Sequence, residues 1–432
     1  MSDPDPNAEA ELPFVQPPLR PRKGRGAVSN LQGRYETLLR EDIDDGWSSG
    51  NLGEVAAEAD SRTDTGAEPD HVPAWKTQII EEQAKTILSR NQSPDVPFSI
   101  SLNPYRGCEH GCIYCFARPT HSYLGLSPGL DFESKIFAKV NAPELLRREL
   151  EKSSYVPEPL AIGVNTDAYQ PCEREYRLTR RILEVLHECE HPLALITKSS
   201  LIERDIDLLA EMASRQQAMA AVTITTLDPE VARTLEPRAA APARRLRTIR
   251  TLANAGIPVG VSVAPVIPFV TDSDLERILE AAAEAGAINA GYVILRLPWE
   301  VSPLFRQWLD AHFPDRTARV MSRVRDMRGG KDYDSTFGKR MHGEGIWADL
   351  IRQRFQKCVA RLGIGIRSGV SGSRFKGLDI SRFRSPSVVP TVTSTVASAV
   401  ASSAKDGTKP AKVKAVKEKA EKDNSRSQFE LF

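Results

Sequence analysis

The sequence lacks several features, and each absence narrows the class of protein. Its 432 residues contain no apolar run approaching the ~20 residues that a membrane-spanning helix needs. The first residues, MSDPDPNAEAELPF, are acidic and polar and do not have the layout of a signal peptide. The formal net charge is only +1, so any contact with nucleic acid must come from local basic patches. We therefore expect a soluble, cytoplasmic protein.

Cysteine is also scarce, because the chain has only 6, and three of these lie in RGCEHGCIYCFARP, residues 106–119. Clustered thiols in a reducing compartment indicate metal binding or catalysis rather than disulfides. Cys108, Cys112 and Cys115 follow a C-x3-C-x2-C spacing, and no fourth cysteine lies nearby. Three thiolates on a four-iron cluster leave one iron open for a substrate or cofactor. The alternative is zinc, with His110 or a distant cysteine as the fourth ligand.

Two segments of biased composition flank a patterned centre. Residues 1–75 are rich in Asp, Glu, Gly, Pro and Ser, show no sustained period, and are predicted to be disordered or loosely draped over the rest. Residues 385–432 are low in aromatics and then Lys-rich, which is typical of a flexible tether. Between them we expect a core domain at 76–310 and a basic extension at 311–384.

Short apolar runs alternate with helical segments in the core domain, which is typical of an α/β fold with a parallel sheet. Six such runs occur: FSISLNPY, LAIGVNT, PLALITK, AVTITTL, PVGVSVAPV and GYVILRL. Six strand–helix units favour a partial (β/α)6 TIM-type barrel, although an open doubly wound sheet also fits. One helix, SDLERILEAAAEAG, is predicted to begin with a capping box of Ser273 and Glu276. Chemistry is expected at the carboxyl ends of the strands.

The cysteine loop resembles the C-x3-C-x-aromatic-C signature of the radical S-adenosylmethionine (SAM) superfamily, with Tyr114 as the aromatic residue. The core from about Phe98 to Leu309 looks like that family's partial barrel. NPYRGCEHGCIYC, TDAYQP and ITKS resemble the branch related to spore photoproduct lyase. The resemblance implies that the three cysteines hold a [4Fe–4S] cluster whose open iron binds SAM. It also implies an electron donor, such as flavodoxin or ferredoxin, and cleavage of SAM to a 5′-deoxyadenosyl radical.

Polar residues at strand ends are candidates for holding SAM, together with Tyr114 in the loop. The resemblance implies that Asn165, Thr166 and Asp167 bind the ammonium of SAM, with Asp167 as the best charge match. Lys198 and Ser199, which end the third strand, are further candidates for binding the cofactor, and Lys198 could meet its carboxylate. The alternatives are that Asp167 serves as a turn residue and that Lys198 extends to solvent.

Further candidates are less specific. Thr225 and Thr226 could bond the ribose, and Arg238 could meet a carboxylate, but ordinary structural roles are equally open. The spore photoproduct lyase branch carries a hydrogen-donating cysteine where this chain has Val164. Cys172 follows several residues later and is a candidate for a radical role or for simple packing. The missing cysteine argues against thymine-dimer reversal.

The basic extension and the last five residues suggest partners. The extension could contact phosphates or could be a solvated surface, and its basic residues are Arg319, Arg323, Arg325, Arg328, Lys331, Lys339 and Arg340. A loop after Gly329 and Gly330 could reach over the barrel mouth. QFELF resembles the peptide with which bacterial repair proteins bind the sliding clamp, through Gln428, Leu431 and Phe432; the alternative is an accidental apolar end.

The sequence thus predicts a lyase-like radical SAM enzyme that acts on damaged DNA. A second hypothesis moves the substrate to RNA, protein or a small molecule. A third is a non-catalytic metal-binding module tethered to the clamp.

Overall fold

The computed structural model describes residues 21–36, 76–366 and 378–386. The QFELF peptide, and with it Gln428, Leu431 and Phe432, lies outside the described residues. None of the described helices is both long enough and apolar enough to cross a bilayer.

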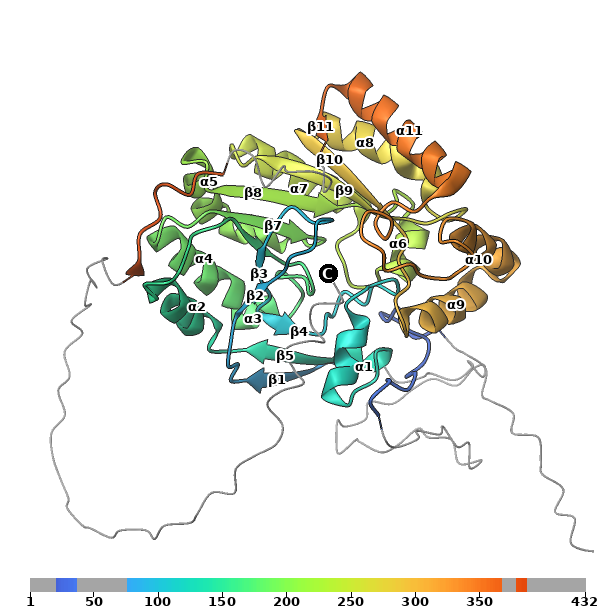
Figure 1. The fold of residues 1–432 in the computed structure, drawn as a ribbon, viewed down its shortest axis with the longest axis horizontal. Coiled ribbons are helices and arrows are strands. Elements are labelled where there is room, and N and C mark those ends of the chain that lie inside the picture. Colours follow the sequence, from blue (N-terminus) through green and yellow to red (C-terminus); the bar gives the residue numbers. More distant parts are fainter. Residues whose placement is uncertain (1–20, 37–75, 367–377, 387–432) are drawn as a thin grey trace, which may run out of the picture.

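A mixed α/β fold is built on an eight-stranded sheet in the order β11-β10-β9-β8-β7-β6-β3-β2 (Figure 1). Neighbours from β3 to β11 pair in parallel, and β2 pairs with β3 in the antiparallel sense. The edge strands β2 and β11 do not pair with each other among the described residues. The strands are β2 (Leu88–Arg90), β3 (Ile100–Leu102), β6 (Leu160–Ile162), β7 (Leu193–Thr197), β8 (Ala218–Thr223), β9 (Val259–Val266), β10 (Asn289–Ile294) and β11 (Gly365–Ile366).

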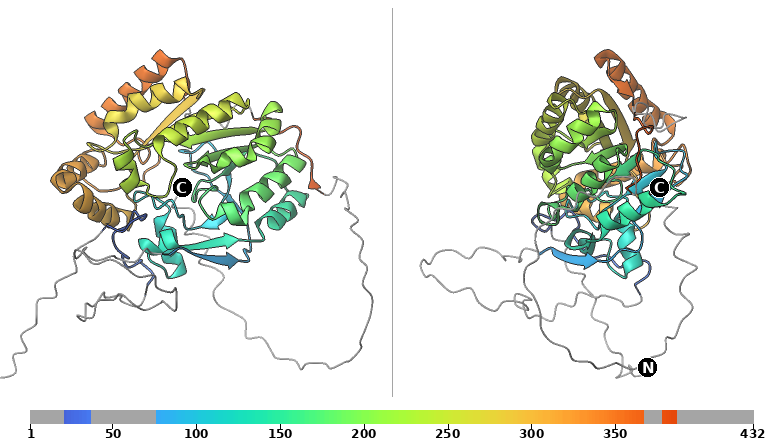
Figure 2. Two further views of the ribbon diagram at one scale, coloured as in Figure 1. Left: turned by 180° about the vertical axis from the view of Figure 1, so that it is seen from behind. Right: turned by 90° about the vertical axis from the view of Figure 1, so that its left-hand side faces the viewer.

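The six central strands follow one another in sequence, as the predicted six-unit pattern requires. They are short apolar runs whose residues are largely buried, because helices cover the outer side of the sheet (Figures 1 and 2). These helices are α2 (Ala142–Glu151), α4 (Leu178–Glu188), α5 (Ile206–Ser214), α7 (Pro242–Asn254) and α8 (Leu275–Glu284). In α4, apolar residues at helical spacing, including Ile182, Leu183 and Leu186, face the core. The parallel α/β class predicted from the sequence is confirmed.

Some local predictions differ from the structure. The fourth strand lies at 218–223 rather than 221–227, so Thr225 and Thr226 follow it instead of ending it. The capping box at Ser273 does not form, because Ser273 lies within a 3-10 turn and α8 begins after Asp274. The Asp274 carboxylate instead accepts a hydrogen bond from Thr226 and ties α8 to the end of β8.

A second, three-stranded sheet in the order β1-β5-β4 borders the cysteine loop. It combines β1 (Gln78–Glu82), β4 (Tyr105–Arg106) and β5 (Lys135–Lys139), and the short helix α1 (Leu130–Ser134) leads into β5. The remaining elements near the sheets are α3 (Glu173–Tyr176), α6 (Pro229–Leu235), α9 (Val301–His312), α10 (Thr317–Asp326) and α11 (Gly345–Leu362). The sequence pattern does not predict the second sheet, because its strands are short and only partly apolar.

Residues 21–36 pack against the core, so the prediction of disorder is wrong for this part of residues 1–75. The backbone N–H groups of Gly26 and Ala27 donate to the buried Glu133 carboxylate at 3.0 and 2.8 Å, and Arg34 pairs with Glu300 at 2.7 Å. Gly26 also touches the cysteine loop, because a Cβ at this position would overlap the carbonyl oxygen of Gly111. Composition could not reveal these contacts, since backbone groups and glycine make many of them.

We expect Gly26→Ala to destabilise the protein. The added methyl group must displace backbone of either the N-terminal segment or the cysteine loop, and such overpacking costs about 1–3 kcal/mol. Gly365→Ala is the matched control, because its Cβ would lie 3.4 Å from the nearest atom, an ordinary contact. Chemical denaturation of both variants measures the difference. Equal stability of the two would show that residues 21–36 are not docked on the loop.

Candidate functional site

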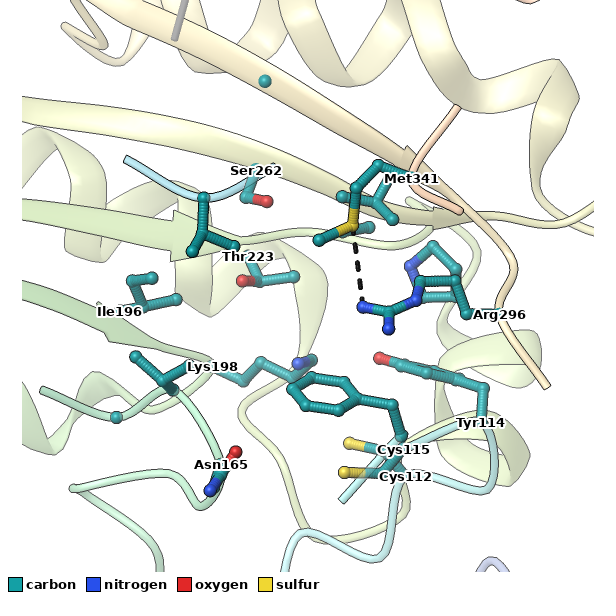
Figure 3. Close-up of a pocket in the computed structure, with 18 of the residues that line it drawn as sticks. Cys112, Tyr114, Cys115, Asn165, Ile196, Lys198, Thr223, Ser262, Arg296 and Met341 are labelled. Carbon is teal, nitrogen blue, oxygen red and sulfur yellow. Dashed lines mark hydrogen bonds between the residues drawn. The ribbon is translucent and has the colours of Figure 1, made fainter. Parts of the chain in front are cut away.

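A cavity of about 320 Å³ opens where the sheet meets the cysteine loop (Figure 3). Residues from the ends of β6, β7 and β10, from the cysteine loop and from the segment before α11 line it together. Eight of the residues proposed from the sequence lie in this lining: Cys108, Cys112, Tyr114, Cys115, Asn165, Thr166, Asp167 and Lys198. The structure therefore brings the three thiols and the strand-end polar residues to one place.

Arg118 fixes the backbone of the cysteine loop. Its fully buried guanidinium donates to the carbonyl oxygens of Gly111 and Cys112, at 3.1 and 2.9 Å, and to those of two residues before α1. Its remaining N–H binds the Glu133 carboxylate, which is also fully buried. All five N–H donors of the guanidinium are thus used, and the loop has little freedom to rearrange.

Tyr114 belongs to a second buried network behind the thiols. Its hydroxyl donates to Glu236, which also accepts from Thr225 at 2.6 Å and pairs with the buried Arg245. Burial alone would raise the pKa of Glu236, but Arg245 and Lys198 outweigh it and lower that pKa to about 2. A charged carboxylate therefore orients the tyrosine between Cys112 and Cys115.

Lys198 points into the cavity from the end of β7 (Figure 3). Its ammonium nitrogen lies 5.7 Å from the centre of the Tyr114 ring. Burial alone would lower the pKa of Lys198, but Cys112 and Glu236 outweigh this effect and raise it, so the side chain remains a cation. The alternative in which Lys198 extends to solvent is not what the structure shows.

Asp167 occupies the cavity wall, but its carboxylate is already engaged. One oxygen accepts from Thr197 at 2.7 Å and from the N–H of Tyr169 at 2.9 Å. The other accepts from the N–H of Lys198 at 2.7 Å and lies 3.3 Å from Nδ1 of His110. Burial would raise the pKa of Asp167, but His110 and these hydrogen bonds hold it below its usual range. The carboxylate joins two strand ends to the cysteine loop, which favours the turn-residue alternative.

Buried polar atoms without a partner mark the part of the wall that can receive a polar ligand. Among the described residues lining the cavity, Oδ1 of Asn165, Nε of Arg296 and Nδ1 of His342 have no hydrogen-bond partner. An unsatisfied buried polar group costs about 1–3 kcal/mol, so such atoms indicate a bound molecule. The Asn165 oxygen and the Lys198 ammonium together suit the ammonium and carboxylate of an amino acid group, which SAM carries.

The three thiols fit an iron–sulfur cluster by donor type and setting. Burial raises the pKa of Cys112 to about 12 and raises that of Cys108 as well, whereas the nearby Lys198 opposes the shift at Cys112. Iron binding would replace the protons of these buried thiols, since metals bind the thiolate form. Across the described ranges, no three His, Cys, Asp or Glu side chains are placed to hold a single metal ion.

Several proposed residues lie away from the cavity. Thr225 is fully buried and bonds Glu236, and Thr226 bonds Asp274, so neither hydroxyl faces the cavity as the ribose role requires. Ser199 caps a 3-10 helix by accepting from the N–H of Leu201 and lies outside the cavity lining.

Arg238 and Cys172 also take structural positions. Arg238 pairs with Glu109 at 3.0 Å, outside the cavity lining. Cys172 packs in a small cluster with Tyr105 and Ile136, and its N–H donates to Glu109 at 2.8 Å. This position favours the packing alternative for Cys172.

The basic extension is largely neutralised within the protein. Four of its proposed residues form ion pairs with acidic side chains: Arg323, Arg325, Lys339 and Arg340. Arg328 is buried and donates to backbone carbonyls. Met341 and His342, which follow the predicted loop, line the cavity, whereas residues 329–338 are not among the lining residues. Sequence reasoning missed this pair and Arg296, since no motif marks them.

Comparisons with known proteins agree with this site. The Radical SAM superfamily profile matches residues 102–282. An uncharacterized protein of Mycobacterium tuberculosis is 39% identical over 226 residues, which are 52% of this chain and 66% of that protein. The match therefore spans just under two thirds of the length of that relative. An uncharacterized protein of Methanocaldococcus jannaschii is 27% identical over 240 residues, 56% of this chain and 85% of that protein.

Among solved structures, a variant of spore photoproduct lyase superposes with a TM-score of 0.50 at 15% identity. The superposition covers 67% of this chain and 80% of that chain, and it shows a similar fold. The matched profile begins at the strand before the cysteine loop and includes all three clustered cysteines. Residues 102–282 of the chain therefore match the radical SAM superfamily.

Proposed function

We propose that the protein is a radical SAM enzyme in which Cys108, Cys112 and Cys115 hold a [4Fe–4S] cluster and the adjoining cavity binds SAM. One observation carries the proposal: the three thiols, the unpartnered Asn165 oxygen and the Lys198 cation line the same cavity. When bound, cluster and SAM together supply reductive cleavage of SAM to methionine and a 5′-deoxyadenosyl radical. A partial (β/α)6 barrel is the architecture that supports this placement best.

The chain's own residues would orient the cofactor and exclude water. Lys198 would hold the carboxylate of SAM through a charge-assisted contact, and Asn165 would accept from its amino group. Asp167 and Tyr114 act as positioning residues, since their polar groups are bound within the protein. Apolar side chains, among them Phe98 and Ile294, line the rest of the cavity and would shield a reactive radical from solvent.

The substrate we propose is damaged DNA, with lyase-like chemistry. The support is the likeness of the cysteine loop, TDAYQP and ITKS to the spore photoproduct lyase branch, together with the clamp-like QFELF peptide. The basic extension adds little, because most of its charges are paired internally. Val164, in place of a hydrogen-donating cysteine, indicates a product other than reversed thymine dimers. A cytoplasmic location and a flavodoxin or ferredoxin donor belong to the same proposal.

The first test concerns the cluster. We expect Cys108→Ala, Cys112→Ala and Cys115→Ala, each purified and reconstituted without oxygen, to lose iron, visible absorption and SAM cleavage. Cys172→Ala is the control and should keep all three, because Cys172 packs outside the cavity. Iron, sulfide and 5′-deoxyadenosine are measured for each protein. Stoichiometric zinc without iron in the wild-type protein would refute the proposal.

The second test concerns the binding of the amino acid group of SAM. Lys198→Met should weaken SAM binding by about tenfold or more, because it removes a cation from the cavity while keeping the side-chain length. Asn165→Ala should weaken binding as well, by removing the only acceptor that we assign to the amino group. Ser199→Ala, next to Lys198 but outside the cavity, serves as the control. Calorimetry on the anaerobic holoenzyme measures the affinities, and unchanged binding in both cavity variants would place SAM elsewhere.

The third test concerns the clamp. Replacing Leu431 and Phe432 by Ala should abolish binding of the full chain to purified bacterial sliding clamp, for which we expect micromolar affinity. The same variant should cleave SAM like the wild type, because the peptide lies far along the sequence from the cysteine loop. Surface capture measures clamp binding. Equal binding by the two proteins would remove this support for a DNA substrate.

A further inference from the structure

Arg296 is a buried arginine whose position nothing in the proposed handling of SAM explains. It follows β10, is only 8% exposed and lines the cavity. Its two terminal nitrogens contact the Tyr333 hydroxyl at 3.2 Å and the Met341 sulfur at 3.6 Å, and its Nε has no partner. The guanidinium carbon lies 5.2 Å from the centre of the Phe116 ring. These neighbours hold the side chain in place without neutralising its charge.

Three other buried arginines in the described part of the chain have an acidic partner, whereas the buried Arg328 binds backbone carbonyl oxygens. Arg118 pairs with Glu133, Arg245 with Glu236, and Arg340 with Asp95, and each of these acids is itself buried. Within the part of the chain that the structure describes, no carboxylate lies within ion-pair distance of Arg296. A buried cation without a counter-charge is expensive to maintain, so the missing anion is expected to come from a ligand.

The surroundings of Arg296 are positively charged. Burial, followed by repulsion from Arg296, lowers the pKa of Arg328 to about 10. Burial likewise lowers the pKa of Arg340, with repulsion from Arg296 contributing. Arg328 donates only to the backbone carbonyls of Leu295 and Lys339. An anion at Arg296 would relieve this repulsion.

We propose that Arg296 binds a phosphodiester group of the nucleic acid substrate inside the cavity. This inference rests on the proposed function and specifies how its substrate is held. A planar guanidinium matches two phosphate oxygens at once, and the Tyr333 hydroxyl beside it can donate a further hydrogen bond. The same cavity wall carries the aromatic rings of Phe98, Phe116 and Tyr292, on which a base can stack.

Arg296 lies apart from the residues proposed to bind the amino acid group of SAM. In Figure 3, Arg296 lies beside Met341, whereas Asn165 lies near the opposite edge of the cavity with Lys198 between. Met341 and Tyr333 belong to the loop between α10 and α11, so the phosphate site would be shared between the sheet and the C-terminal extension. A single cavity can thus hold the reacting cofactor at one side and a substrate anion at the other.

The test compares a charged dinucleotide with an uncharged one on the anaerobic holoenzyme. The probes are thymidylyl-thymidine and its methylphosphonate analogue, in which a methyl group replaces the charged oxygen of the linking phosphate. We expect the wild type to bind the charged probe about tenfold or more tightly than the analogue, and Arg296→Gln to bind both alike. Arg296→Lys should keep part of the preference, because it keeps the charge but loses the planar fork. Arg319→Gln, an exposed arginine of α10, should keep all of it.

Each outcome decides the inference. A charge preference that survives in Arg296→Gln, equal binding of both probes by the wild type, or no binding of either probe would overturn it. Circular dichroism melting shows whether the Gln and Lys variants fold, and the Lys variant remains informative if the Gln variant does not. Formation of 5′-deoxyadenosine by the wild type without any probe tests the proposed chemistry separately. Cleavage of SAM by a protein that does not prefer the charged dinucleotide would refute only the phosphate site.

Discussion

The buried ion pair between Arg118 and Glu133 is the interaction on which the rest of the site depends. Arg118 holds the carbonyl oxygens of Gly111 and Cys112, and Glu133 binds the backbone of Gly26 and Ala27. Both side chains are fully buried, so removing either partner would leave an unpaired charge at a cost of about 3–5 kcal/mol. One pair therefore joins the N-terminal segment, the cysteine loop and α1, and it aims three thiols at one cavity.

The polar residues around the cysteine loop fall into two groups. One group shapes the cavity wall, and the other keeps polar atoms exposed to the cavity. Asp167, Glu236 and Tyr114 satisfy one another or the backbone and give the wall its shape. Lys198, Asn165 and Arg296 keep polar atoms turned toward the cavity. Strand-end placement around a parallel sheet makes this division possible, because neighbouring strands deliver side chains from distant parts of the sequence to one edge.

The sequence predicts what periodicity and local spacing encode. Alternating apolar runs predicted the parallel strands, and the cysteine spacing with Tyr114 predicted the centre of the site. Contacts between distant segments were out of reach: Gly26 against Gly111, or Arg296 beside Met341, leave no local pattern. Asp167 was predicted to carry a charge for the ligand, but its sequence position could not show that four neighbours already engage it. The position of Thr225 differs from the expected strand end for a simpler reason, since β8 ends at Thr223, four residues earlier than expected.

We propose that SAM binds with its amino acid group at the cluster held by the cysteine loop. The most direct measurement is electron–nuclear double resonance on the reduced holoenzyme with SAM isotopically labelled at its amino nitrogen. The account predicts hyperfine coupling between that nitrogen and the cluster, because the open iron and the Asn165 and Lys198 side chains share one cavity. A reduced cluster that binds SAM without any such coupling would contradict the account.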